Sequence, residues 1–272
     1  MSDTKLRSAY VLSALIAVLA LIAAGAGLLI DELYQGNALL VAGWHGNDLV
    51  TLTVAIPTLV ASLILSVRGS RRARLVWLGM LAYTLYNFAY YLFGAAFNSF
   101  FLLYVTLFDL SIFALIFALV RLDVDDIGQS FSGGTPVKWI AGFMGFVAIG
   151  LTAVYASESL KFVVTGQVPE IVISTGHLTN IVFALDLSLV VPWFILGAIW
   201  LWQRRPWGYV LATILNVKGA VYMLALSAVT VSAVRAGASD DLAQVWLWGT
   251  IGLGSLVASL VLLGNVEPIE RR

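Results

Sequence analysis

The sequence predicts an all-α integral membrane protein with about eight transmembrane helices and both termini in the cytoplasm. Hydrophobic residues make up 61% of the 272-residue chain and charged residues only 11%, whereas about a quarter of a soluble domain is charged. The mean hydropathy is +0.96. The apolar stretches are long enough to cross a bilayer, and the basic residues concentrate in alternate loops. These observations define the fold class.

The predicted helices follow from length. A spanning helix needs roughly 20 mostly apolar residues, because each residue advances about 1.5 Å through a hydrocarbon core of about 30 Å. The stretches that meet this requirement are 9–30, 49–67, 75–96, 100–120, 137–157, 179–202, 207–232 and 244–264. The segments between them leave no room for a second domain. We therefore expect residues 1–272 to form a single polytopic transmembrane domain.

The first stretch has a second interpretation. Residues 5–27 (KLRSAYVLSALIAVLALIAAGAG) could be read as a signal peptide with a small-residue cleavage site. The apolar run is long for a signal core, so we prefer a spanning helix. Cleavage would leave seven helices and would not change the orientation of the others.

Basic side chains in the loops set the predicted orientation. With eight crossings, one side of the membrane receives most of the basic residues, among them Arg68, Arg71, Arg72, Arg74, Arg121, Lys138, Arg204 and Arg205. Acidic residues dominate the other side. Since cytoplasmic loops carry an excess of lysine and arginine, both termini are expected inside. We expect a multi-pass protein of a prokaryotic plasma membrane.

The loops on the acidic side are long and contain apolar patches. They cover residues 31–48 and 158–178. We expect them to pack at the membrane interface rather than fold back as a cap. On the basic side, the loop that starts at Asp123 begins like a calcium-binding loop. Its fifth and twelfth places are Ile127 and Gly134, which offer no side-chain oxygen, so a solvated acidic turn is the better interpretation.

The composition excludes several kinds of chemistry. The chain has no cysteine, which removes disulfides, cysteine-ligated metals and thiol catalysis. The two histidines, His45 and His177, fall at the ends of predicted segments and leave little for a membrane haem pair. A formal net charge of zero argues against a nucleic-acid partner. We predict no cofactor and no metal; the expected partners are the lipid bilayer and a possible small-molecule solute, with the oligomeric state left open.

Three ionisable residues lie inside predicted spans. Asp109 and Asp186 are each about 13 Å from the outer end of their helices, and Lys218 is about 16 Å from the inner end of its helix. Such charges cost about 2.5–3.5 kcal/mol each and usually face the protein interior and pair. Two carboxylates and one ammonium leave an excess negative charge. We expect either a protonated carboxyl, or a cation or ligand group that completes the site.

Aromatic and amide side chains are predicted at the same depth. Tyr83, Asn87 and Tyr91 follow each other at intervals of four and share one helical face. Tyr222 follows Lys218 by four residues, and Trp193 lies on the helical face of Asp186. The predicted substrate-binding or ion-coupling residues of this polar, aromatic cavity are Asp109, Asp186, Lys218, Tyr83, Asn87, Tyr91, Tyr222 and Trp193.

Two sequence features suggest irregular or repeated helices. Pro57 and Pro192 interrupt apolar stretches and are expected to kink them. Asp-Leu-Ser occurs at 109–111 and again at 186–188, at the same predicted depth. This echo indicates either a duplicated helix hairpin in parallel orientation or a chance match among abundant leucines.

The function best suited to these features is a small-solute or ion- or proton-coupled transporter. Asp186 would be the coupling carboxylate, Asp109 its partner and Lys218 the competing internal cation. One alternative is a buried Asp/Lys cluster that only fixes helix packing. Another is a membrane-embedded enzyme with Lys218 as nucleophile or base, although the usual hydrolase motifs are missing. A third is a receptor in which Lys218 holds retinal; the arrangement resembles a protonated Schiff base, without the motifs of microbial rhodopsins.

Overall fold

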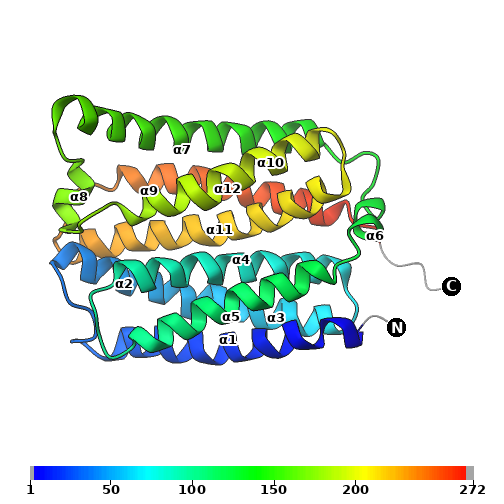
Figure 1. Ribbon diagram of the computed structural model, residues 1–272, viewed down its shortest axis with the longest axis horizontal. Coiled ribbons are helices and arrows are strands. Elements are labelled where there is room, and N and C mark those ends of the chain that lie inside the picture. Colours follow the sequence, from blue (N-terminus) through cyan, green and yellow to red (C-terminus); the bar gives the residue numbers. More distant parts are fainter. Residues whose placement is uncertain (1–2, 268–272) are drawn as a thin grey trace.

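The computed structural model describes residues 3–267, and its regular secondary structure there is helical, apart from an isolated bridge between Phe131 and Val266 (Figure 1). Seven helical segments are long and apolar enough to cross a membrane. They are Leu6–Leu29, Ala38–Val67, Phe101–Val120, Val137–Thr165, Ile181–Trp202, Pro206–Arg235 and Ala243–Gly264. The first of these forms most of α1 (Asp3–Leu29), and Phe101–Val120 is α5, Val137–Thr165 is α7, Pro206–Arg235 is α11 and Ala243–Gly264 is α12.

Helix α4 (Arg71–Gly94) contains the remaining predicted span, 75–96, and is not among the seven. Its arginines, tyrosines and asparagine lower its hydropathy. It nevertheless runs alongside the others in the middle of the bundle (Figure 1), and more than half of its residues are buried. Length and composition therefore support seven spanning helices, one fewer than predicted.

The loop prediction for residues 31–48 was wrong in part. Helix α2 (Ala38–Val50) begins well before the predicted span at 49, because the side chain of Asn37 caps it by accepting a hydrogen bond from Leu40 N at 3.0 Å. The second long loop is also shorter than predicted. Helix α7 continues to Thr165, and the short helix α8 (Glu170–Thr175) follows.

Both proline-interrupted spans contain a π-helical turn. In the first, η1 (Thr51–Ala55) separates α2 from α3 (Ile56–Val67). In the second, η2 (Asp186–Val190) separates α9 (Ile181–Leu185) from α10 (Val191–Trp202). Proline has no N–H to donate to the preceding turn of the helix. The regular hydrogen bonds are therefore interrupted, and the turn before each proline is π-helical. The irregularity expected at both prolines is thus a π-helical turn.

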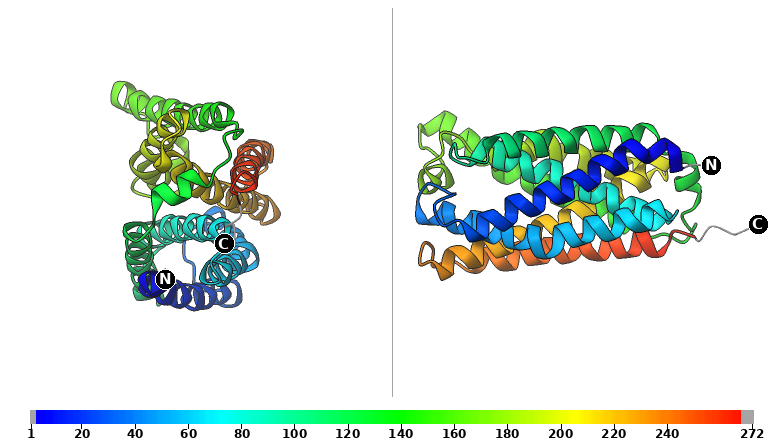
Figure 2. Two further views of the ribbon diagram at one scale, coloured as in Figure 1. Left: turned by 90° about the vertical axis from the view of Figure 1, so that its right-hand side faces the viewer. Right: turned by 90° about the horizontal axis from the view of Figure 1, so that it is seen from below.

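The helices form two halves in which the long helices follow one another in the same order. The first half contains α1 to α5, and the second half contains α7 to α12. Seen along the bundle, the two halves lie on opposite sides of a shared centre (Figure 2, left). Helices α1 and α7 lie at opposite extremes, while α4 and α11 meet in the middle, where they pack against each other.

Matching local geometry shows that the segment from η1 to α4 is repeated from η2 to α11 with one constant offset in the sequence. The offset that carries the start of η1, Thr51, onto the start of η2, Asp186, also carries the start of α4 onto the start of α11. The turns before those helices share three backbone hydrogen bonds: Arg68 to Ile64, Gly69 to Ser66 and Ser70 to Leu65 correspond to Gln203 to Ile199, Arg204 to Leu201 and Arg205 to Trp200. Gly69 and its counterpart Arg204 both have a positive φ. Both halves thus run through the bundle in the same direction.

Close contacts between the halves obey the same relation. A methyl group on Gly46 of α2 would lie 2.7 Å from the backbone N of Val229 in α11. The counterpart of this pair is Ile181 and Gly94, which also touch, since a methyl group on Gly94 would lie 3.1 Å from Cδ1 of Ile181. The repeat is therefore present in tertiary packing as well as in local geometry.

The Asp-Leu-Ser echo does not mark this repeat. Asp186 begins η2, and its counterpart in the first half is Thr51. Asp109 lies in the middle of α5, and α12, the last helix of the second half, contains no aspartate. The hairpin duplication that the echo suggested is wrong, and the repeat with one constant offset covers η1 to α4 and η2 to α11.

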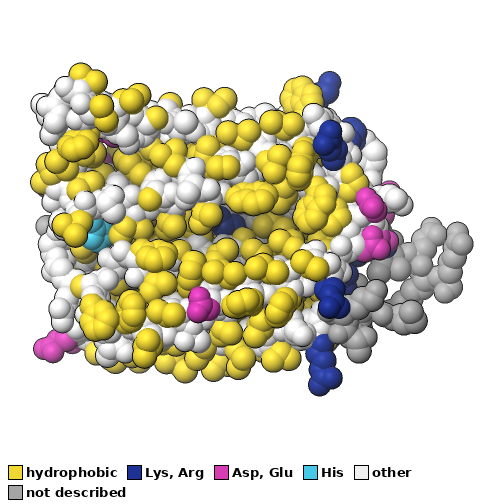
Figure 3. Space-filling model, in the orientation of Figure 1, with side chains coloured by type: hydrophobic (Ala, Val, Ile, Leu, Met, Phe, Trp, Pro, Cys, Tyr) yellow, Lys and Arg dark blue, Asp and Glu magenta, His cyan; other side chains and the backbone are white. Residues whose placement is uncertain are grey.

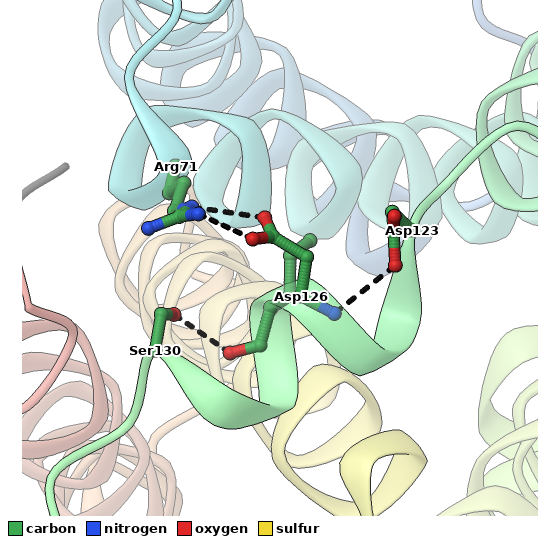
Figure 4. A network of polar contacts seen from close by, with 5 residues as sticks. Arg71, Asp123, Asp126 and Ser130 are labelled. Carbon is green, nitrogen blue, oxygen red and sulfur yellow. Dashed lines mark hydrogen bonds and ion pairs between the residues drawn. The ribbon is translucent and has the colours of Figure 1, made fainter. Parts of the chain in front are cut away.

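Basic side chains gather at one end of the bundle (Figure 3), the end where α1 begins and α12 ends (Figure 1). Here the linker between the halves carries the short helix α6 (Val124–Gln129). Asp123 caps α6, and Asp126 accepts from Arg71 at the start of α4 (Figure 4). The expected solvated turn is thus a small helix that ties the linker to the first half.

Candidate functional site

A cavity of about 460 Å³ lies between the two halves. Helices α4 and α5 form one wall, and η2, α10 and α11 form the other. Three tryptophans and several aliphatic residues line it: Trp193, Trp200, Trp207, Leu115, Leu119, Leu189, Leu211 and Ile214. Figure 3 shows a hollow in this hydrophobic side face with one basic side chain at its back. Lys218 is the basic residue among those that line the cavity.

Lys218 is buried, with 5% of its surface exposed, in the thirteenth position of α11. Its ammonium nitrogen lies 3.7 Å from the ring centre of Tyr86 and 4.3 Å from that of Tyr222. These cation–π contacts satisfy the charge in part. In the described part of the chain, the ammonium has neither a hydrogen-bond acceptor nor an acidic partner within 4.0 Å. The ammonium of this cavity-lining residue therefore has two tyrosine rings beside it and no hydrogen-bond acceptor for its N–H groups.

Asp186 lies behind the cavity wall, with 3% of its surface exposed. The Tyr86 hydroxyl donates to its Oδ1 at 2.7 Å, and the Tyr155 hydroxyl of α7 donates to Oδ2 at 2.9 Å. Tyr86 thus touches both charges, Asp186 with its hydroxyl and Lys218 with its ring face. The hydroxyl of Tyr222 lies 3.1 Å from that of Tyr86. The result is an aspartate and a lysine that are bridged by a tyrosine rather than paired directly.

A second buried carboxylate, Asp48, lies in the first half. Its exposed fraction is 2%, and it accepts hydrogen bonds from Tyr34 at 2.6 Å and from Tyr91 at 2.7 Å. Asn47 donates to Tyr91 and to Oδ1 of Asn87, at 3.0 and 2.8 Å. These residues come from α2, α4 and the α1–α2 loop. They form a closed polar cluster, which we call the Asp48 cluster.

In the part of the chain whose side chains the structure describes, two polar atoms beside the Asp48 cluster have no hydrogen-bond partner. They are Nδ2 of Asn87 and the hydroxyl of Tyr104 on α5, both in buried residues. An unpaired buried donor costs about 1–3 kcal/mol, so such atoms usually mark a site with a missing partner. The cluster is therefore more than a closed packing contact.

The predicted site residues separate into three groups. Lys218, Tyr222 and Asp186 lie together, and Trp193 lines the cavity beside them. Tyr83, Asn87 and Tyr91 are buried on the other side of α4, where they face α2 and the Asp48 cluster.

The structure does not bring Asp109 into either cluster. Asp109 is exposed on α5. Figure 3 shows an acidic side chain over this helix, in the middle of an otherwise hydrophobic face, and Asp109 is the acidic residue of α5. The expectation that it partners Asp186 is therefore wrong: the helix turns the carboxylate outward, and Tyr86 and Tyr155 take the partner's place.

Sequence analysis missed Asp48, Tyr34 and Tyr155. Asp48 was assigned to a loop because the apolar stretch starts after it. The cap at Asn37 and the interval of four between Asn47 and Thr51 were signals for a longer helix. Tyr155 is the one tyrosine of α7, and nothing in its sequence context distinguishes it from packing tyrosines.

The repeat relates the polar pairs of the two halves. Thr51 hydrogen-bonds Tyr83 at 3.2 Å across η1 and α4. Their counterparts in the second half are Asp186 and Lys218. The same two backbone positions thus hold a neutral pair in the first half and a charged pair in the second.

The chain matches no family model, no curated protein and no solved structure. Among the side chains of residues 6–267, no three acidic or histidine side chains are grouped to hold a metal ion. A fold alone does not define an activity, so the function has to be argued from the site.

Proposed function

We propose that the protein is a membrane carrier for a small amphipathic anion, which binds in the cavity between the halves with its charged group at Lys218. The observation that carries the proposal is an ammonium at an apolar cavity that has two tyrosine rings beside it but, in the described part of the chain, no hydrogen-bond acceptor. A buried charge without acceptors is costly, and an anionic oxygen supplies both the charge and the acceptors. The apolar walls suit the rest of the ligand.

The cavity has the properties of a ligand site. Its volume of about 460 Å³ falls within the range of about 300–1,000 Å³ for small-molecule pockets. Trp193 and Trp207 are 47% and 37% exposed at its rim. A ligand with an apolar body would therefore enter sideways from the bilayer and leave its polar group against Lys218.

The repeat supports transport rather than binding alone. Transporters are often built from two related halves, with the substrate site between them at discontinuous helices in corresponding positions. Here the discontinuous spans are those with η1 and η2, and the cavity lies between the halves. Rocking of one half against the other would expose Lys218 alternately to the two sides.

The proposal includes the placement in the membrane. We assign α4 as an eighth crossing, because it is as long as its neighbours and lies among them. The end with the basic side chains then faces the cytoplasm by the positive-inside rule, and both chain ends lie there. The membrane is assigned as the plasma membrane on the same rule.

Binding is tested with 10-bromodecane-1-sulfonate in lipid nanodiscs, because bromine quenches nearby tryptophan fluorescence and the sulfonate stays charged at all working pH values. We expect saturable quenching that Lys218→Met weakens at least tenfold, as expected for a lost charged hydrogen bond. Lys138→Met is the matched control, since Lys138 also contacts a tryptophan ring, that of Trp202, but lies outside the cavity. Quenching that is equal for both variants, or equal to that by 10-bromodecanol, would refute the proposal.

Transport is tested by counterflow of labelled decane-1-sulfonate in proteoliposomes. A carrier exchanges labelled for unlabelled anion, and Lys218→Met should abolish the exchange. Binding without counterflow would leave a binding protein and refute the carrier.

A covalent carbonyl ligand is the second candidate. Lys218 places an amine at the back of a tryptophan-lined cavity, with Asp186 close by as counter-ion. An aldehyde would condense with this amine and release water. Native mass spectrometry with an absorbance spectrum tests this: an added mass or visible band that is lost in Lys218→Met supports it, and no adduct rules it out.

A further inference from the structure

We propose that Asp48 is the carboxylate that takes up a proton when the anion binds, so that the carrier is a proton–anion symporter. This inference rests on the proposed function and deepens it. Asp48 lies outside the cavity and was not among the predicted site residues. Four features carry the argument: its missing counter-charge, its closed coordination, its access to one end of the bundle and its connection to Lys218 through α4.

The charge of Asp48 has no cation nearby. The groups that face it are phenols: Tyr34 from the α1–α2 loop, Tyr91 from α4 and, next to the Tyr91 ring at 5.2 Å, Tyr104 from α5. Helix α1 presents the backbone of Gly27, and α11 packs against the neighbouring Gly46 with Ala228 and Val229.

Two further titratable groups are near. Tyr83 of α4 is hydrogen-bonded to Thr51 at 3.2 Å, and His45 lies one helical turn before Asp48, with its ring 5.8 Å from that of Tyr34. Among the described side chains, those of residues 6–267, the one ion pair below 4.0 Å joins Arg71 and Asp126 at the basic end. Asp186, by contrast, has Lys218 on the other side of a shared tyrosine. The protein interior therefore contains two carboxylates and one ammonium, as expected, but the second carboxylate is Asp48 and not Asp109.

The coordination of Asp48 selects a proton over a metal ion. Each carboxylate oxygen already receives a phenolic hydrogen, from Tyr91 on Oδ1 and from Tyr34 on Oδ2. The α1 backbone closes Oδ2 from another side, because a Cβ on Gly27 would overlap that oxygen. A sodium ion needs several free oxygen ligands around it, and this site offers no such space. A proton needs only one lone pair.

The Asp48 cluster has a route for that proton. His45 is half-buried at the end of the bundle opposite the basic side chains, and its ring contacts the buried Tyr34. Tyr34 can pass its hydroxyl proton to Oδ2 across the 2.6 Å hydrogen bond, and its phenolate can then take a proton from hydronium of the aqueous phase on the His45 side, which leaves water. One O–H bond forms on Asp48, the phenol is restored, and one proton has entered.

Helix α4 connects Asp48 to the cavity. Two neighbouring residues face the two sites: Tyr86 donates to Asp186 and covers Lys218, and Asn87 accepts from Asn47 in the Asp48 cluster. Movement of α4 on anion binding would therefore change the hydrogen bonds of the Asp48 cluster. Uptake of one proton also balances the charge, since the bound anion adds one negative charge to the interior.

The experiment measures protons directly. Decane-1-sulfonate is added to the purified protein in weakly buffered detergent solution with a pH-indicating dye. Because the sulfonate does not titrate, any proton uptake belongs to the protein. We expect uptake of up to one proton per bound anion, lost in Asp48→Asn while bromodecanesulfonate still binds. Asp126→Asn, a change in the exposed ion pair with Arg71, should behave as wild type.

The outcomes separate the two proposals. No saturable binding to the wild type refutes the proposed function. Binding without proton uptake, or uptake unchanged in Asp48→Asn, refutes the proton site and leaves the carrier intact. Uptake lost in Asp186→Asn but kept in Asp48→Asn would assign the proton to Asp186 instead and overturn the inference.

A second measurement covers a failure of Asp48→Asn to fold. In the wild type, infrared difference spectra between anion-bound and anion-free protein should contain the C=O band of a newly protonated carboxyl group. Tyr34→Phe removes one hydrogen bond to this group and should shift the band. A missing band, or a band that Tyr34→Phe leaves in place, would overturn the assignment.

Discussion

Gly46→Ala should push the two halves apart where α2 crosses α11. The added methyl group would lie 2.6 Å from the backbone O and 2.7 Å from the backbone C of Ala228. Carbon contacts are most favourable at about 3.5–4.0 Å, so the helices must separate by about 1 Å. Backbone atoms of α11 cannot rotate away as a side chain would. The strain therefore has to be relieved by moving a whole helix.

The magnitude follows from a comparison with a glycine in open space. Overpacking costs about 1–3 kcal/mol, while replacing glycine by alanine in a helix gains about 1 kcal/mol. Gly142 on α7 is the matched control, since nothing lies within 4 Å of a methyl group placed there. Both variants gain the same helix propensity. We therefore expect Gly46→Ala to be less stable than Gly142→Ala by about 1–3 kcal/mol.

The assay is equilibrium unfolding in mixed micelles with increasing dodecyl sulfate, followed by far-ultraviolet circular dichroism. Counterflow of decane-1-sulfonate on the same variants would show whether the spacing of the halves also affects transport. Equal stabilities of the two variants would mean that α2 and α11 are not in backbone contact at Gly46, and the description of the interface would be wrong.

Three further predictions concern the charged residues. Lys218→Met should lower the free energy of unfolding by less than about 2 kcal/mol, because no direct ion pair is broken. If Lys218 and Asp186 served only as a structural ion pair, the substitution would lower it by about 3–5 kcal/mol, and adding Asp186→Asn would restore stability. The double variant Asp186→Thr/Lys218→Tyr, which copies the first half, should fold and keep its thermal stability but lose saturable bromodecanesulfonate quenching; loss of folding would contradict the repeat. Dicyclohexylcarbodiimide, which reacts with carboxyl groups exposed to lipid, should modify Asp109 and leave Asp48 unmodified by peptide mass mapping; the reverse would contradict the burial of the two residues.

Much of the fold follows from hydropathy, because the membrane imposes the length and the apolar character of a spanning helix. The predicted ends of α5 and α12 agree with the structure within one residue. The exceptions are helices whose polar residues face protein instead of lipid. Helix α4 is not among the seven apolar spans because its arginines, tyrosines and asparagine lower its hydropathy, although the asparagine and most of the tyrosines are buried in the protein. Composition alone cannot distinguish that burial from exposure to water.

The candidate site could be predicted only in part, because depth in the membrane does not give direction. Asp109 and Asp186 were assigned the same depth, yet one faces outward from α5 and the other faces Tyr86. The direction of each side chain depends on the rotation of its helix, which the packing of neighbours sets. The proximity of Lys218 and Tyr222 could be predicted because residues four apart on one helix share a face, whatever the helix packs against.

The repeat left little trace in the sequence. Over residues 51–91, only Leu52, Pro57 and Ile64 have identical counterparts in the second half. Backbone geometry was retained where side chains diverged, as the positive φ at Gly69 and Arg204 shows. Apolar residues inside a bundle can replace one another as long as volume and pattern are kept, so sequence identity can be lost while the fold is retained. A short echo such as Asp-Leu-Ser is correspondingly weak evidence.

The comparison of the halves separates scaffold from function. Both π-helical turns precede a proline, and one begins with Thr51 and the other with Asp186. Because the turn forms with threonine as well as with aspartate, the proline accounts for it and the carboxylate does not. Tyr83 likewise shows that the position of Lys218 accepts an uncharged residue in the same packing. The fold therefore requires neither charge. Their joint presence beside the cavity in one half only is what a binding role explains and a packing role does not.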